Sequence, residues 1–260
     1  MNWIANFIRG FLLSFNAIST LTKPGLKRYV AFPVLINAVI FIAGFVLLWT
    51  YRIGLIEWIY KPYPDDNTWQ LILWYFIAIF LFGGIILVAY FLFTPIGCLL
   101  ASPFNDSLAG KTEQLLSPDE PQEEIPLSAG KFMKTVGKEI AKVILVSVVM
   151  TLTFLLNLLP VIGTILFLLC TATLGAFVIA LQYLDYPMDR HDFSLLEVAK
   201  TITGNLSLCL GFGLGAMLLL MIPFLNLICI PVCVIAATSL FVGLKNEGRI
   251  VVANKIAKES

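Results

Sequence analysis

The segment best suited to chemistry is Lys23-Pro24-Gly25-Leu26-Lys27-Arg28, which directly precedes a charge-free stretch. A Pro-Gly turn that opens into a helix leaves the N–H groups of the first helical turn unpaired. These donors, with the positive end of the helix dipole, favour an anion. Lys27 and Arg28 add two charges, and Arg can grip a tetrahedral oxyanion through two donors. The segment predicts an anion site, and a juxtamembrane basic anchor is the alternative that stays open.

A second polar segment, 185–192, holds Asp185, Asp189, Asp192 and the only histidine, His191. Its carboxylates suggest a metal site or acid–base chemistry, but their spacing matches no known metal motif. We therefore favour a hydrated connector whose polar residues cap helix ends. None of the five cysteines forms a CxxC pair, and with one histidine a zinc site is not expected.

Two further patterns argue against an enzyme. Gly110-Lys111-Thr112 resembles the end of a P-loop, but position 105, where the motif requires glycine, is Asn105. The only histidine lies outside the apolar stretches, and no two aspartates lie inside them, so the residues for intramembrane proteolysis are missing. We expect neither an enzyme nor a cofactor.

Polar residues within apolar stretches are costly in a bilayer and mark functional positions. They are candidates for lining a pore or the helix breaks, although each could instead join helices. These residues are Asn37, Asn105, Asn157, Gln182, Asn226 and Thr238.

The composition sets the class of protein. Apolar residues make up 59% of the 260 residues and charged residues 13%, with a mean hydropathy of +0.93. Soluble domains carry about 25% charged residues, so this chain is expected to be an integral membrane protein. Its net charge of +1 gives no reason to expect a nucleic-acid partner.

Four charge-free stretches predict the membrane architecture, which is all-α within a single domain, 1–260. A spanning helix needs about 20 apolar residues, so 29–51 and 69–101 are predicted transmembrane helices. The stretches 143–184 and 201–244 are each broken near the middle by Pro, Gly and Asn, without charged turn residues. We interpret both as re-entrant hairpins with tips inside the bilayer, and two full spans each remain the alternative.

Charge asymmetry predicts the orientation. Of 17 Lys and Arg residues only Arg52 and Lys61 lie in the loop 52–66, and the others fall on the opposite side. By the positive-inside rule both termini are expected in the cytoplasm.

Amphipathic segments flank this core. Aromatic and aliphatic residues at helical spacing predict an interfacial helix over 1–23. The region 106–142 is expected on the cytoplasmic side, and 245–260 forms a basic tail. Within 106–142 a lysine stripe could concentrate anions or, as we favour, hold anionic lipid. The stripe consists of Lys131, Lys134, Lys138 and Lys142.

Five ordered motifs resemble the CysZ sulfate permease family. They are Gly25-Leu26-Lys27-Arg28-Tyr29-Val30 followed by Pro33, Leu35 and Asn37; Pro103-Phe104-Asn105 with Leu108-Ala109; Pro160 with Gly163; Gln182-Tyr183-Leu184-Asp185-Tyr186-Pro187 with Asp189 and His191; and Ile222-Pro223, Leu225-Asn226-Leu227, Pro231 and Ala237-Thr238. The resemblance covers about residues 20 to 240.

This resemblance implies a multi-pass protein of the bacterial inner membrane that admits sulfate for assimilation and cysteine synthesis without hydrolysing ATP. It implies a sulfate site at Gly25, Leu26, Lys27 and Arg28, and sulfite or related oxyanions as further substrates. We also expect a homo-oligomer, because partly penetrating hairpins need neighbours to bury their tips. A non-conducting membrane scaffold or regulator of an uptake or biosynthetic complex is the alternative function.

Three features depart from the family pattern. Lys27 replaces the usual arginine and keeps the charge but loses the planar fork. Gly110 stands where a glutamate is expected, which argues against a carboxylate there in a pore. The family implies oppositely oriented protomers, whereas the charge asymmetry predicts one orientation.

Overall fold

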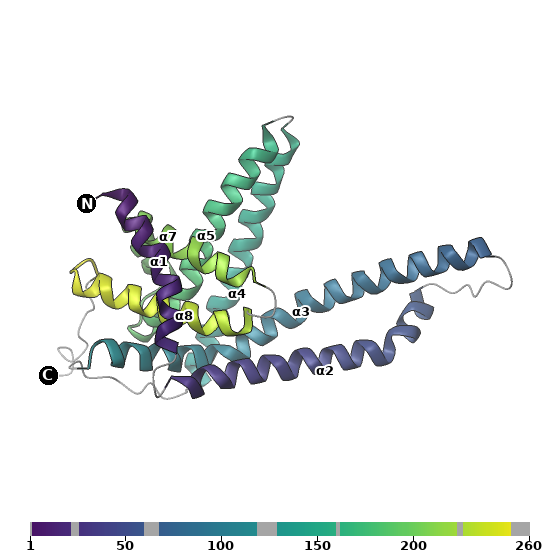
Figure 1. Ribbon diagram of the computed structural model, residues 1–260, viewed down its shortest axis with the longest axis horizontal. Helices are drawn as coiled ribbons and strands as arrows, with labels where there is room; N and C mark the ends of the chain where they lie inside the picture. The colour runs from purple at the N-terminus through teal and green to yellow at the C-terminus, as the bar shows by residue number, and fades with distance from the viewer. Residues whose placement is uncertain are drawn as a thin grey trace. The chain divides into compact units, whose positions relative to one another are not determined.

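The computed structural model describes residues 2–21, 26–59, 68–118, 129–159, 162–222 and 226–250. These residues form helices and no strand, which confirms the predicted all-α class (Figure 1). Four of the described helices are long and apolar enough to cross a membrane. The chain divides into two compact units, Pro33–Ser102 and the combination of Met1–Phe32 with Pro103–Ser260. Each unit has its own internal packing.

The unit Pro33–Ser102 consists of parts of two long helices. Helix α2 (Lys27–Ile59) has 33 residues and α3 (Thr68–Leu116) has 49. The predicted transmembrane segments 29–51 and 69–101 lie within them. Large apolar side chains point outward, and Phe45, Trp69 and Phe80 are 62%, 78% and 77% exposed. Such surfaces are stable only against lipid or protein, as expected for an integral membrane protein.

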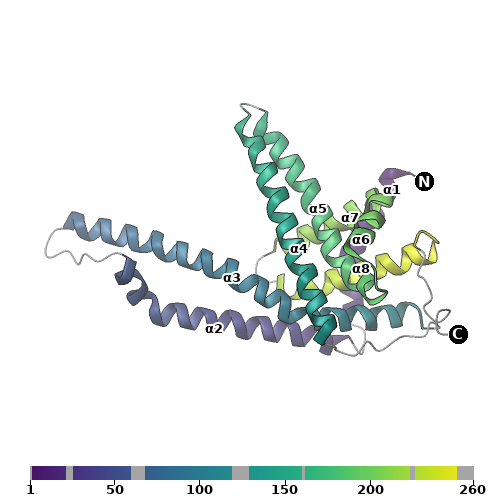
Figure 2. The same ribbon diagram turned by 180° about the vertical axis from the view of Figure 1, so that it is seen from behind.

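The first hairpin is formed by α4 (Ala129–Phe154) and α5 (Gly163–Arg190), which Figure 2 shows as a pair. The short 3₁₀ helix η1 (Leu155–Leu158) lies at its tip. A Cβ at Gly163 would lie 2.2 Å from the Leu156 carbonyl oxygen, so the closed tip requires glycine there. The hairpin extends beyond the predicted range 143–184 at both ends. By length alone each of its helices could cross a membrane.

The second hairpin has a different construction. Helix α6 (Leu195–Gly204) meets α7 (Leu206–Leu220) at an angle of 106°, and α8 (Asn226–Asn246) follows. The part of the predicted range 201–244 before Leu206 therefore belongs to a separate helix. The 15 residues of α7 extend about 22 Å at 1.5 Å per residue, which is less than a hydrocarbon core of about 30 Å.

Helix α1 (Trp3–Leu21) packs on α7 through glycine contacts. A Cβ at Gly10 would lie 2.0 Å from the Leu208 carbonyl oxygen, and one at Gly211 would lie 2.1 Å from that of Phe7. Small residues let two backbones approach closely, which is how helices associate in membranes. The opposite face of α1 exposes Ile8 and Leu12. Its interfacial position stays a prediction, but its inner face belongs to the helical core.

Candidate functional site

The predicted anion segment precedes a helix as expected. Helix α2 begins at Lys27, and Leu26 immediately before it is fully buried. Gly25 and the side chains of Lys27 and Arg28 lie outside the described residues. The start of α2 therefore places its first-turn N–H groups at the predicted segment.

A polar cluster joins the two helices of the first hairpin. Lys142 Nζ on α4 donates to Asp185 Oδ2 on α5 at 3.1 Å and to Glu139 Oε1 at 2.6 Å. One turn away, Lys138 Nζ donates to Asp185 Oδ1 at 3.4 Å and also binds Asp189. The Lys142 side chain is 4% exposed and that of Asp185 9%. Charges buried to this degree persist only when paired, so the cluster holds α4 to the end of α5.

These contacts correct two interpretations of the sequence. Lys138 and Lys142 are engaged by buried carboxylates, so half of the predicted lysine stripe is not a surface for anions or lipid; the side chains of Lys131 and Lys134 lie outside the described residues. The segment 185–192 is not a hydrated connector, because α5 continues through Pro187 to Arg190 and buries Asp185. The loop that follows ends at Ser194, whose side chain caps α6.

The last residues of α5 also contact the end of α3. Arg190 Nη1 donates to the backbone oxygen and Oδ2 of Asp106, both at 3.3 Å. The guanidinium lies over Gly110, where a Cβ would come within 2.5 Å of the Arg190 Cζ. Where the resemblance leads us to expect a glutamate, this chain uses glycine and fills the space with arginine.

The only histidine, His191, adds a second contact between the end of α5 and α3. His191 Nε2 lies 2.7 Å from Glu113 Oε1, and its ring stacks on Phe241 of α8 with centroids 5.2 Å apart. The Glu113 side chain is 5% exposed. Among the described residues no group of His, Cys, Asp and Glu could hold a metal ion. His191 therefore joins α3, α5 and α8.

We predict that Gly110→Leu destabilises the protein by displacing the Arg190 guanidinium. Overpacking costs about 1–3 kcal/mol, and the contact of Arg190 with Asp106 would be lost as well. The thermal midpoint of the detergent-purified variant should fall by several degrees. In an Arg190→Ala background, where the space is vacant, the same leucine should cost clearly less. Equal costs in the two backgrounds would contradict this account of Gly110.

The other predicted site residues are dispersed. Asn105 is 2% exposed, and its Nδ2 donates to the Tyr186 hydroxyl at 3.3 Å. Gln182 Nε2 donates to Glu139 Oε2 at 3.2 Å, and Thr238 donates to the Val234 carbonyl at 2.8 Å. Asn157 is exposed within η1. The side chains of Asn37 and Asn226 lie outside the described residues. The structure thus connects Gln182 to the hairpin cluster and Asn105 to α5.

Long apolar helices with outward-facing apolar side chains, joined by small buried polar clusters, define a multi-pass helical membrane protein. Comparison with known proteins identifies the family of membrane proteins to which the chain belongs. A family described as "Sulfate transporter CysZ/Etoposide-induced protein 2.4" matches residues 13–231, and the chain belongs to this family.

Relatives from three bacteria are each named "Sulfate transporter CysZ". The protein from Vibrio cholerae is 32% identical over 222 residues, which cover 84% of this chain and 87% of the relative. That from Pectobacterium atrosepticum is 30% identical over 226 residues, 85% of this chain and 80% of the relative. That from Pseudomonas aeruginosa is 26% identical over 241 residues, 90% and 94%. The similarity extends over most of both chains in every case.

Proposed function

We propose that this chain is a sulfate permease of the bacterial inner membrane, which admits sulfate for assimilation into cysteine without hydrolysing ATP. The observation that carries the proposal is the start of α2 at Lys27, directly after the buried Leu26. Backbone N–H groups at Gly25 and Leu26, with the charges of Lys27 and Arg28, bind sulfate at this helix start. The names of the bacterial relatives support sulfate as the substrate.

The route of the ion must supply donors or water, because a dianion cannot enter hydrocarbon without replacement for its hydration shell. Of the polar residues proposed to line this route, Asn105 fits best. It is buried, and its Oδ1 has no hydrogen-bond partner among the described residues, so it can accept a hydrogen bond from water. Asn37, Asn157, Gln182 and Asn226 remain in the proposal as further candidates.

The architecture proposed for the permease includes partial penetration of the second hairpin. The shortness of α7 and the 106° bend before it support this placement. The apolar side chains exposed on α4 and α5 are covered by lipid and by further copies of the chain in a homo-oligomer. Both termini lie in the cytoplasm in this arrangement.

Uptake of radiolabelled sulfate into proteoliposomes tests the function. Vesicles that contain the purified protein are expected to accumulate sulfate well above protein-free vesicles of the same lipid, without ATP. Unlabelled sulfate and sulfite should compete, and chloride should not. If protein that is folded and inserted takes up no more sulfate than empty vesicles, the chain is a scaffold or regulator instead of a permease.

A further inference from the structure

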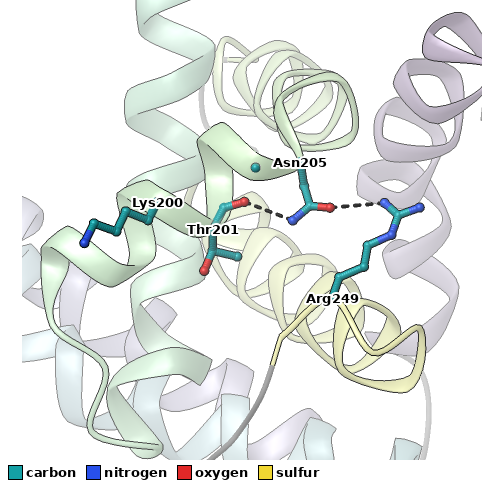
Figure 3. A pocket seen from close by; sticks show the side chains of 5 residues that line it. Lys200, Thr201, Asn205 and Arg249 are labelled. Carbon is teal, nitrogen blue, oxygen red and sulfur yellow. Dashed lines mark hydrogen bonds between the residues drawn. The ribbon is translucent and has the colours of Figure 1, made fainter.

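A polar pocket of about 570 Å³ lies where α6 bends into α7. Its lining consists of Lys200, Thr201, Gly204, Asn205 and Arg249. Figure 3 places Asn205 between the Thr201 carbonyl and the Arg249 guanidinium, with Lys200 on the other side of Thr201. Both charged residues among the described lining residues are cations. Arg249 Nε also pairs with Glu247 Oε2 at 3.0 Å, but Glu247 is shared with Arg9, so the two arginines and the glutamate together keep a net positive charge. The pocket therefore suits a ligand with negative charge.

The Asn205 side chain bonds to neighbours other than the backbone N–H groups at the start of α7. Its Nδ2 donates to the Thr201 carbonyl at 3.0 Å, and its Oδ1 accepts from Arg249 Nη1 at 3.1 Å. As the N-cap of α7 it makes no side-chain cap hydrogen bond, although asparagine is among the best N-cap residues. The first-turn N–H groups of α7 thus receive no cap from the Asn205 side chain, which instead holds Arg249 at the pocket.

The sequence around the pocket places it at the surface of the membrane. Helix α6 carries Glu197 and Lys200, whereas α7 is uncharged from Leu206 to Leu220. Helix α8 is uncharged until Lys245, and Glu247 and Arg249 follow it. Both chain segments change from charged to apolar at the pocket, as expected at the boundary between headgroups and hydrocarbon. Leu206, beside Asn205, is 43% exposed and offers a surface for an acyl chain.

We propose that this pocket binds the phosphate of an anionic phospholipid headgroup, with the acyl chains along the exposed face of α7. Arg249 pairs with the phosphate, and Asn205 fixes its guanidinium. The exposed Lys200 side chain, which points away from Arg249 in Figure 3, turns toward the bound phosphate. Inorganic phosphate or sulfate shares the charge, but it cannot use the apolar surface at Leu206. A lipid is therefore the occupant that matches both features of the pocket.

Native mass spectrometry of the full-length protein in detergent tests the proposal. Phosphatidylglycerol and phosphatidylcholine with the same acyl chains are titrated, and phosphatidylglycerol is expected to bind about tenfold more tightly. Lys200→Gln/Arg249→Gln should lose about tenfold of this affinity and keep that for phosphatidylcholine. Lys200→Gln alone should show a partial loss, and it leaves the contacts of Arg249 intact. Lys111→Gln, which changes an exposed lysine on α3, is the matched control and should bind as the native protein does.

The proposal is overturned by any of three results. The first is a double variant that binds phosphatidylglycerol as tightly as the native protein in preparations with unchanged thermal midpoints. The second is equal binding of phosphatidylcholine and phosphatidylglycerol to the native protein. The third is displacement of the lipid by inorganic phosphate or sulfate at the same concentration, which would make the pocket a site for a free anion.

Discussion

Replacing Lys27 and Arg28 together by alanine is expected to reduce sulfate uptake about a hundredfold, the largest functional effect we predict. Each hydrogen bond to a charged group contributes about 1.5–3 kcal/mol, and two such losses at the lower end of this range, as expected for a solvated site, correspond to a factor of about 100. The first-turn N–H groups of α2 remain, so residual uptake should follow sulfate concentration with weaker apparent affinity. Initial rates of radiolabelled uptake over a range of sulfate concentrations measure both quantities.

Two variants give this experiment its controls. Lys27→Arg keeps the charge and restores the planar fork that binds oxyanions through two donors, so uptake should be retained or increased. Lys111→Ala removes an exposed lysine elsewhere on the surface and should leave uptake unchanged. If the double alanine variant inserts normally and takes up sulfate at the native rate, Lys27 and Arg28 are only a basic anchor.

The helical class was predictable because charge-free stretches report directly on the hydrocarbon environment. The break before Gly163 was predictable for a similar reason, since Pro and Gly interrupt helices whatever surrounds them. The helical class and the helix break both depend only on residues close together in the sequence. The start of α2 after Pro24-Gly25 is predictable in the same way, because turn residues followed by an apolar stretch predict a helix start.

The buried ion cluster was missed because it depends on two segments together. Taken alone, the spacing of Lys138 and Lys142 predicts a surface stripe, and the segment that contains Asp185 and Asp189 predicts a connector. The signal was present in their spacing. Both pairs are four residues apart, so each lies along one face of a helix, and their opposite charges match when α4 and α5 pair. Pro187 also argues against a helix in this segment, because proline usually interrupts helices. Neighbouring helices can nevertheless accommodate a proline in a membrane helix, as α5 shows.

The contact of Arg190 with Gly110 was beyond prediction for a different reason. The glycine was recognised as a departure from the family pattern, but a missing side chain does not indicate what fills its place. Only the packing of α5 on the end of α3 brings the guanidinium to within 2.5 Å of the position of a Cβ. The pocket beside Asn205 depends likewise on the 106° bend between α6 and α7, which follows from packing.

Lys142→Met is expected to have the largest effect on stability, because it removes the cation between the buried Asp185 and the part-buried Glu139 and leaves Asp185 with its longer contact, 3.4 Å, to Lys138. Breaking one side of a buried ion pair costs about 3–5 kcal/mol, and because Lys138 still contacts Asp185 we expect the lower end of this range, a decrease of about 10 °C in the thermal midpoint. Methionine preserves the length and the apolar stem of the lysine, so the loss reports the charge and not a cavity. Thermal midpoints of purified protein in detergent measure the effect.

Adding Glu139→Gln to Lys142→Met should recover part of this loss. The second change removes one of the two carboxylate charges that Lys142 had balanced. The new amide oxygen can still accept from Gln182 Nε2, which donates to Glu139 in the native protein. Glu139→Gln alone, with Lys142 still paired to Asp185, should cost less than Lys142→Met. If the double variant is no more stable than Lys142→Met, the cluster does not act through its charge balance, and the packing of α4 on α5 must carry the stability instead.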